Sequence, residues 1–344
     1  MDEKLIQSIY QNTKDLKDPV TKDLWYIDNK KINIACKNGN INIAIAIKQN
    51  QESLYSNLIS DIKRVVQDID GVLSVNIVLT SESEKKFENL KEKKFSISAK
   101  KIIAIASGKG GVGKSTFAVN FALALKKLGN EVGILDADIY GPSIPRMMGI
   151  SDRPKTNESQ KLIPLINFDI KCMSIGFLID VDTPAIWRGP MVMKALEQMF
   201  NGVEWGKLDY LIIDLPPGTG DAQLTLAQNS KLTGAIIVST PQDVALIDVR
   251  KGINMFNKVN VPLLGIVENM SYFMCNKCNE KHYIFSNGGA KKESEKYNIP
   301  FLGELPIDID LRIQSDEGVP SCISNIDSNI SKIFISIAKK FKIN

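Results

Sequence analysis

The stretch Ile102-Ile-Ala-Ile-Ala-Ser-Gly-Lys-Gly-Gly-Val-Gly-Lys-Ser-Thr116 decides the fold of this 344-residue chain. Residues 102–106 form a short apolar run, rich in isoleucine and stopped by glycine-rich sequence, which predicts a buried strand. Apolar side chains recur at helical spacing over 118–127, which predicts a helix. Between them, residues 108–115 read Gly-x-x-x-x-Gly-Lys-Ser, the spacing of a phosphate-binding loop. The stretch therefore predicts an α/β nucleotide-binding domain.

The residues of this loop predict its ligands. Its glycines allow consecutive backbone N–H groups to converge on phosphate oxygens. Lys114 supplies positive charge to the β- and γ-phosphates and is a catalytic candidate, and Ser115 is a ligand of Mg²⁺. We therefore expect ATP and Mg²⁺ to bind here. The nucleotide-binding candidates in the loop are Gly108, Lys109, Gly110, Gly111, Val112, Gly113, Lys114, Ser115 and Thr116.

The chain divides into three predicted parts. Residues 1–80 combine helical patterns at 5–16 and 54–66 with alternating apolar strands, which indicates a small α+β domain. Residues 81–99 are charged, carry serine and lack apolar periodicity, and we interpret them as a linker. Strands and helices then alternate over 100–344, which predicts a doubly wound, mostly parallel sheet that binds its ligands at the carboxyl ends of the strands.

Acidic residues follow two further predicted strands of the large domain. Asp136 and Asp138 come directly after residues 132–135, and two carboxylates at this spacing can face one metal–phosphate centre. Asp214 ends the apolar run 208–214, where it can hold a water molecule bound to Mg²⁺. The Pro-Pro-Gly-Thr-Gly turn after it has the rigid and permissive residues of a switch loop.

Composition narrows the class of protein. The chain is 44% apolar and 24% charged, as is typical of globular proteins, and its net charge of +4 is spread too thinly to indicate nucleic-acid binding. The N-terminus does not resemble a signal peptide and no apolar run approaches a membrane span, so we expect a cytoplasmic protein. Five cysteines, an odd number, argue against a disulfide framework.

Cys275 and Cys278 are spaced Cys-x-x-Cys, which zinc, iron–sulfur and redox sites share. One pair supplies two of the four ligands that a zinc ion or a cubane cluster needs. A two-fold dimer would double the pair to four thiolates at its axis. His282, the one histidine, could be a third ligand, but we favour a loop histidine because the symmetric site already has four. Cys36 lies on a predicted strand and is interpreted as a buried core thiol.

The second lysine of the loop, Lys109, makes the pattern resemble the deviant Walker A motif of the MinD/ParA/nitrogenase-iron-protein class. Members of that class sandwich two nucleotides between two subunits, and the resemblance implies that Lys109 reaches the partner's nucleotide. It also implies that Asp136 belongs to the Mg²⁺ shell and that Asp138 positions or deprotonates the attacking water. Asn269 would bind the adenine edge, and Pro306 would lie in a second loop that lines the adenine.

Residues 100–320 are similar, more specifically, to the Mrp/Nbp35 (ApbC-like) iron–sulfur cluster carrier ATPases. This resemblance implies a homodimeric ATPase that carries a labile [4Fe–4S] cluster on Cys275 and Cys278 and transfers it to apo iron–sulfur proteins. The chain departs from the family at Asn276, where proline is more common, and at Ser286, where glycine is usual. The motifs that carry the similarity are Gly108–Ser115, Asp136-Ala-Asp-Ile-Tyr-Gly-Pro-Ser143, Trp187-Arg-Gly-Pro190, 205–221, Thr240-Pro-Gln-Asp243, 268–273 and Cys275–Cys278.

The small domain resembles the MIP18-like domain that often precedes such carriers. That family usually has a cysteine in the loop before its second helix, whereas this chain has Lys48-Gln-Asn-Gln-Glu-Ser53. The loop therefore lacks the residue on which a role of this domain in handling clusters would rest.

Two other functions share the nucleotide motifs. A MinD/ParA-type positioning ATPase would rely on a surface helix, and residues 330–342 have amphipathic spacing with a basic face. We favour a helix packed on its own domain, since a large sheet needs covering helices, and we expect no stable membrane association. The other alternative is a zinc-stapled nucleotide-binding scaffold that transfers no cluster.

Overall fold

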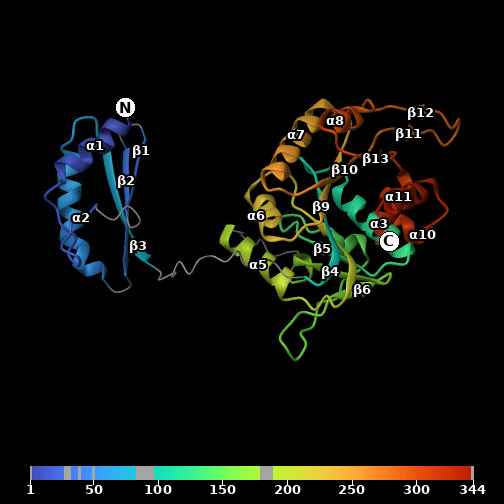
Figure 1. Cartoon of the computed structure of the whole chain (residues 1–344), viewed down its shortest axis with the longest axis horizontal. Coiled ribbons are helices and arrows are strands. Elements are labelled where there is room, and N and C mark those ends of the chain that lie inside the picture. The colour runs from blue at the N-terminus through green and yellow to red at the C-terminus, as the bar shows by residue number, and fades with distance from the viewer. Residues whose placement is uncertain are drawn as a thin grey trace. The chain divides into compact units, whose positions relative to one another are not determined.

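The computed structural model describes residues 2–26, 32–37, 40–48, 51–82, 97–178 and 189–341. The chain forms two compact units, Met1–Lys91 and Glu92–Asn344 (Figure 1). The division falls within the predicted linker, of which residues 83–96 lie outside the described part. The strand before the linker ends at Glu82, and the strand after it begins at Ala99. The first two residues and the last residue of the predicted linker therefore belong to strands.

The small unit is a three-stranded sheet with two helices. Strands β1 and β2 are antiparallel, β2 and β3 are parallel, and the strand order is β1-β2-β3. Strand β2 reads Asn-Ile-Asn-Ile-Ala-Ile-Ala-Ile-Lys, and its four isoleucines are buried against the apolar face of α2. The elements are α1 (Asp2–Asn12), β1 (Ile32–Lys37), β2 (Asn40–Lys48), α2 (Glu52–Gln67) and β3 (Ser74–Glu82).

Two details of the small unit differ from the expectation. The first helix ends at Asn12, and Leu16, whose spacing suggested a longer helix, packs on the core from the following turn. Cys36 is half-buried at the margin of the core, because it pairs with Ile41 on the isoleucine face of the sheet but lies on the edge strand β1. The likeness to a MIP18-like domain stays a prediction.

The large unit has a doubly wound sheet, as the sequence predicted. In the described part, eight strands have the order β13-β10-β9-β4-β8-β5-β7-β6, and all neighbours are parallel except β6 and β7. Its strands are β4 (Ala99–Ala106), β5 (Val132–Asp136), β6 (Leu165–Asn167), β7 (Ile170–Ser174), β8 (Leu208–Asp214), β9 (Gly234–Ser239), β10 (Leu263–Glu268) and β13 (Phe301–Glu304), and a separate hairpin joins β11 (Phe273–Met274) and β12 (Lys281–His282).

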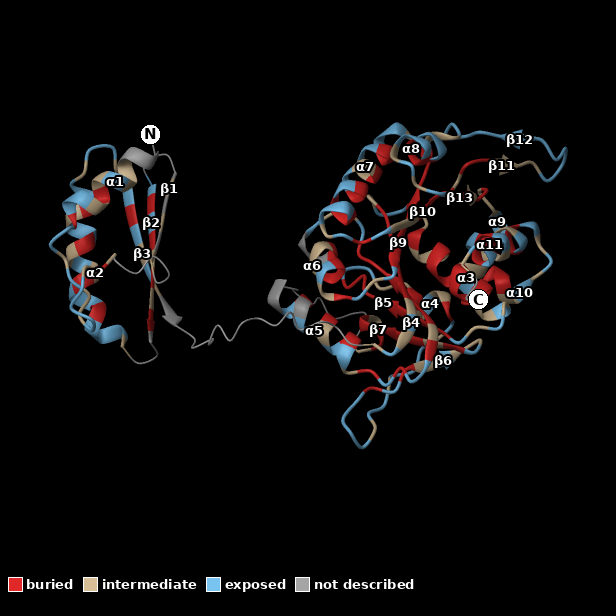
Figure 2. Ribbon diagram, viewed as in Figure 1, coloured by how far each residue is buried: buried red, intermediate tan, exposed pale blue. Residues whose placement is uncertain are grey.

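Helices cover both faces of this sheet. Figure 1 shows α6, α7 and α8 on one side, with α3, α10 and α11 on the other. The central strands are almost entirely buried between these layers (Figure 2). The helices are α3 (Lys114–Lys127), α4 (Ile144–Met147), α5 (Gly189–Asn201), α6 (Asp221–Asn229), α7 (Asp243–Lys258), α8 (Gly289–Tyr297), α9 (Ile309–Glu317), α10 (Ser321–Ser324) and α11 (Asn329–Lys339), with a 3₁₀ turn, η1, at Ile175–Phe177.

The amphipathic C-terminal helix packs on its own domain. In α11, Phe334 and Ile337 are buried, and the Phe334 ring lies 5.9 Å from the ring of Phe117 on α3. Phe341, just beyond α11, meets Phe121 edge to face at 5.4 Å. The apolar face of α11 is therefore covered by the phosphate-loop helix.

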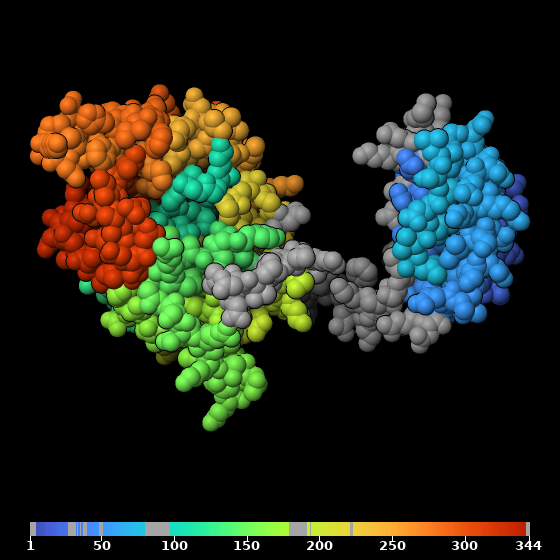
Figure 3. All heavy atoms as spheres, turned by 180° about the vertical axis from the view of Figure 1, so that it is seen from behind, coloured from blue at the N-terminus to red at the C-terminus, as the bar shows by residue number. Residues whose placement is uncertain are grey.

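An exposed segment projects from the large unit. Residues 151–161 are largely exposed and stand out from the large unit (Figure 3). Among the described residues, every helix is too short or too polar to cross a membrane.

Candidate nucleotide site and cysteine hairpin

The phosphate loop connects the carboxyl end of β4 to the start of α3, as predicted. Gly111 and Gly113 have φ angles of +81° and +83°, which side chains rarely adopt. A Cβ atom on Gly113 would lie 2.2 Å from Nδ2 of Asn269, and one on Gly108 would lie 2.3 Å from Cβ of Asp248. These glycines are therefore needed for backbone conformation and for close packing.

A cavity of about 400 Å³ opens over this loop. Gly110 and Gly111 face open space, so backbone groups of the loop are accessible from the cavity. The wall opposite the loop comes from the segments after β5, β8 and β10. The lining residues are Lys109, Gly110, Gly111, Gly113, Lys114, Ser115, Thr116, Asp138, Gly141, Ser143, Met147, Pro217 and Met270.

Three sequence elements meet at Lys114. Its ammonium lies 2.6 Å from Oδ1 of Asp214 and 3.6 Å from Oδ2 of Asp138. The Ser115 hydroxyl donates a 2.5 Å hydrogen bond to the other oxygen of Asp214. Lys114 and Asp214 are buried, so the lysine charge is balanced inside the protein. The structure thus brings together the residues that the sequence assigned to phosphate and Mg²⁺.

Asp136 is fully buried at the end of β5. Its carboxylate accepts hydrogen bonds from the backbone N–H groups of Asp138 and Ile144 and from the Ser174 hydroxyl. Burial, reinforced by the charge of Asp214, raises the pKa of Asp136 to about 7. Burial also raises the pKa of Asp138, while the charge of Lys114 lowers it. The hydrogen bonds hold the Asp136 carboxyl in one orientation. Its raised pKa makes its charge sensitive to nearby cations.

The donor set suits Mg²⁺. The Ser115 hydroxyl and the carboxylates of Asp136 and Asp214 are hard oxygen ligands, the kind Mg²⁺ prefers. Buried carboxylates of this kind also gain from a cation that neutralises them.

Lys109 lies at the rim of the cavity with its side chain partly exposed. Its ammonium is 3.9 Å from the carboxylate of Asp248 on α7, which also pairs with Lys251 at 2.9 Å. The side chain is therefore free to leave this long contact. The reach of Lys109 to a partner's nucleotide stays a prediction.

Neither adenine candidate is among the residues that line this cavity. Asn269 is buried, and its amide donates a 2.8 Å hydrogen bond to the Val112 carbonyl behind the loop. Pro306 lines a second cavity, of about 240 Å³, which Tyr272 and Asn276 also line. Base recognition by Asn269 and Pro306 stays a prediction, and the observed role of Asn269 is to brace the phosphate loop.

The cysteine pair lies on the hairpin of β11 and β12. The Cys275 N–H donates to the carbonyl of Glu280, and the Asn279 N–H donates to the carbonyl of Cys275, at 3.0 and 2.8 Å. Asn279 has a φ angle of +55°, which reverses the chain directly after Cys278. Ser286, where the related family has glycine, has a φ angle of +74°. The two hydrogen bonds therefore close the turn although Asn276 replaces the usual proline, and Ser286 takes a backbone conformation that favours glycine.

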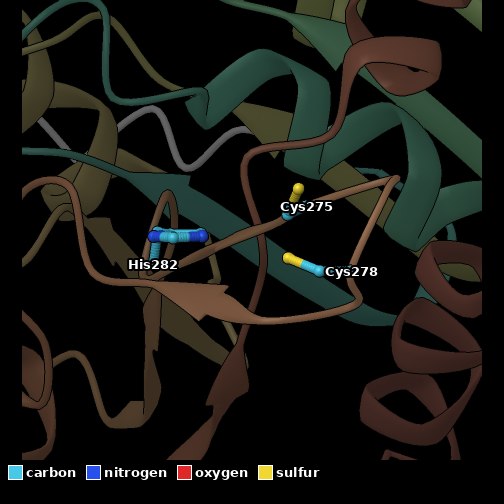
Figure 4. Close-up of side chains that lie close together, drawn as sticks. All are labelled: Cys275, Cys278 and His282. Carbon is cyan, nitrogen blue, oxygen red and sulfur yellow. The ribbon is translucent and has the colours of Figure 1, made fainter.

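The structure places His282 beside the cysteine pair. The metal-binding atoms of Cys275, Cys278 and His282 all lie within 4.8 Å of one another (Figure 4). Strand pairing is the cause, because His282 on β12 is opposite Phe273 on β11, two residues before the first cysteine. N–H groups of Cys278 and Lys277 lower the pKa of the Cys275 thiol, which favours its thiolate form. The potential metal-binding atoms of His282 and the two cysteines thus form one group of three.

Two buried residues of the site were not predicted. Ser174, at the end of β7, bonds Asp136. Glu268, at the end of β10, accepts hydrogen bonds from the Ser271 hydroxyl and from the N–H groups of Gly288 and Ala290. The available sequence signal was a polar residue at the end of a buried strand. Several such positions exist, and their spacing does not indicate which of them belong to the site.

The fold and the site define a P-loop NTPase with an additional cysteine hairpin. The ParA-type family described as NUBPL iron-transfer P-loop NTPase matches residues 98–342. The chain belongs to this family, which confirms the resemblance and the fold class drawn from the motifs.

Relatives and a solved structure agree with this membership. The iron-sulfur cluster transfer protein NUBPL of Dictyostelium discoideum is 56% identical over 243 residues, covering 70% of this chain and 75% of the relative. The iron-sulfur cluster carrier protein of Synechocystis sp. is 44% identical over 312 residues, covering 89% and 88%. A nucleotide-binding protein from Archaeoglobus fulgidus was solved in complex with ADP, and cobalt was found in that structure. It is 41% identical to this chain with a TM-score of 0.60, and the match covers 69% of this chain and 93% of the solved one.

Proposed function

We propose that this protein is an ATP-hydrolysing iron–sulfur cluster carrier that works as a cytoplasmic homodimer. Cys275 and Cys278 of two protomers would together bind one labile [4Fe–4S] cluster and transfer it to apo iron–sulfur proteins. Membership of an iron-transfer family and the names of the relatives support the cargo. The observation that carries the proposal is the position of both thiols on one hairpin turn, where Cys275 is half-buried and Cys278 is exposed (Figure 4).

The number of ligands favours a dimer. A cubane cluster is typically held by four thiolates, and the hairpin supplies two. Cys172 and Cys322 are buried in the core of the large unit, where burial raises the pKa of both thiols, and Cys36 belongs to the small unit. A second copy of the hairpin supplies the missing pair by symmetry.

The nucleotide site provides the residues for hydrolysis of ATP. Lys114 would bind the β- and γ-phosphates, and Ser115, Asp136 and Asp214 would hold Mg²⁺, which neutralises developing charge on the phosphates. Asp138 lines the cavity and would orient the attacking water and accept its proton. The water oxygen then bonds to the γ-phosphorus while the bond from that phosphorus to ADP breaks. Lys109 of the partner would add positive charge.

The positioning alternative is weakened by the fold. A membrane-binding helix needs a free apolar face, and that face of α11 packs on α3. The scaffold alternative would contain zinc, whereas a cluster carrier would contain iron and sulfide. Metal analysis therefore separates the two.

Anaerobic reconstitution tests the proposed cargo. Wild type should bind about four irons and four sulfides per dimer, the content of one cubane. Cys275→Ala combined with Cys278→Ala should lose this iron and sulfide while nucleotide affinity stays within about two-fold, because the two sites use different residues. Cys36→Ala is the matched control and should keep the cluster. A double variant that still binds four irons per dimer would refute the cluster site, and zinc without sulfide in the wild type would favour the scaffold.

A further inference from the structure

We propose that a single protomer binds one divalent transition-metal ion through the sulfur atoms of Cys275 and Cys278 and a ring nitrogen of His282. This mode differs from the proposed cluster site in three ways. It requires the histidine, it is complete within one chain, and it takes one ion without sulfide. It uses the same two thiols, so ion and cluster would exclude each other.

The distances fit a mononuclear ion. The three ligand atoms lie within 4.8 Å of one another. Metal–sulfur bonds of about 2.3 Å and metal–nitrogen bonds of about 2.0 Å place tetrahedral ligand atoms about 3.5–3.8 Å apart. Small side-chain rotations would close the remaining gap. In a cubane each thiolate binds a different iron atom, so the sulfur atoms are held farther apart than around one ion.

The backbone holds the ligands on one side of the hairpin. Two hydrogen bonds close the turn, from the Cys275 N–H to the Glu280 carbonyl and from the Asn279 N–H to the Cys275 carbonyl. The ladder of β11 and β12 then brings His282 back beside the turn. Figure 4 shows the two sulfur atoms close together with the imidazole ring on the returning strand. No large rearrangement of the chain is needed to assemble the three ligands.

The chemistry of the ligands selects the ion. Two thiolates and one imidazole are a donor set of zinc sites, and cobalt(II) takes the same geometry as a spectroscopic probe. Cys278 and His282 are exposed, so a water molecule or another ligand can fill the fourth position. An open position distinguishes this site from a closed structural zinc site.

Cobalt titration of the full-length, metal-free chain under anaerobic conditions tests the proposal. Wild type should bind about one Co²⁺ per protomer, with visible d–d bands and an X-ray absorption edge that report tetrahedral coordination by two sulfur atoms and at least one nitrogen. His282→Ala should weaken this binding by about ten-fold or more, as the loss of a direct ligand exceeds typical losses of supporting groups. Glu280→Gln, on the same exposed turn, is the control and should titrate as wild type.

Two outcomes would overturn the inference. One is a His282→Ala variant that binds cobalt as tightly as wild type. The other is one cobalt per two protomers with four sulfur ligands, which would show that the pair binds metal only across a dimer. Iron and sulfide content of His282→Ala separates this inference from the cluster proposal. That variant should keep its cluster, since a four-thiolate site does not use the histidine.

Discussion

The nucleotide site and the cysteine hairpin are built in opposite ways. Lys114, Asp136 and Asp214 are at most 6% exposed and lie within one chain, where α3 begins and where β5 and β8 end. Cys278 and His282 are exposed on a hairpin whose strands are two residues long. A buried site in a packed core has one arrangement, whereas an exposed hairpin leaves coordination positions open. The residues of the nucleotide site are therefore preorganised by one chain. The ligand of the cysteine hairpin depends on which further group fills its open coordination positions.

The two regions meet at the end of strand β10. Asn269 bonds the Val112 carbonyl of the phosphate loop, and the adjacent Glu268 bonds Gly288 and Ala290 beyond the far end of the hairpin. One strand end thus contacts both the phosphate loop and the start of α8, the helix that follows the hairpin.

The largest expected effect tests how strictly the nucleotide site is preorganised. Lys114→Ala should weaken ATP binding by about 100-fold or more, since a buried charged partner is worth about 2–5 kcal/mol. It removes the phosphate cation and leaves the buried Asp214 carboxylate without its 2.6 Å partner. Isothermal titration calorimetry gives the affinity. Lys126→Ala, which breaks an exposed pair with Glu131, is the control, and equal losses in both variants would contradict the assignment.

The next effect separates binding from chemistry within the same site. Asp138→Asn should keep nucleotide affinity while phosphate release slows by about 100-fold or more, the range of a lost general base. The side chain lines the cavity and is 3.6 Å from Lys114. Steady-state phosphate release beside equilibrium ATP binding makes the distinction. Unchanged turnover would remove Asp138 from the chemistry.

A smaller effect follows from the cost of burying Asp136. Its pKa is raised from 3.8 to about 7, so between these values the folded state holds a proton that the unfolded state releases. The free energy of unfolding therefore falls as pH rises through this interval, and the penalty is fully present above about pH 7. Asp136→Asn does not titrate, so its melting temperature should fall less between pH 5 and pH 8 than that of wild type, by about 2 °C or more.

Differential scanning calorimetry of the nucleotide-free protein measures this shift. The exposed Asp152→Asn is the control and should follow wild type. Parallel pH profiles of wild type and Asp136→Asn would show that burial of this carboxyl carries no proton linkage.

The smallest expected effect on stability comes from Lys109 at the rim of the nucleotide cavity. This side chain is partly exposed, as the residues of the hairpin are. Lys109→Ala removes a 3.9 Å contact to Asp248 from a side chain that is 37% exposed, so the melting temperature should change by less than about 1 °C. ATP turnover should fall only at protein concentrations at which dimers form. Turnover equal to wild type at every concentration would exclude a role of Lys109 in the partner's site.

The sequence alone determined the elements whose residues are close along the chain. The phosphate loop follows from eight consecutive residues between a strand and a helix, and Asp136, Asp138 and Asp214 were assigned because each follows an apolar strand. Strand–helix alternation also predicted the parallel sheet. These placements needed only local spacing, because backbone geometry converts spacing into direction within one element, whereas the separate roles of Asp136 and Asp138 came from the resemblance.

Only the tertiary structure decided which distant residues meet. Lys114 and Asp214 are 100 positions apart and touch because β4 and β8 are neighbours in the sheet. Asn269 braces the phosphate loop from 157 positions away. His282 lies beside the cysteines because β12 pairs with β11, whereas the sequence alone favoured a loop histidine, since a symmetric site already has four thiolates. Such contacts depend on strand order and register, and these are set by packing of the whole sheet and hairpin, which no local pattern encodes.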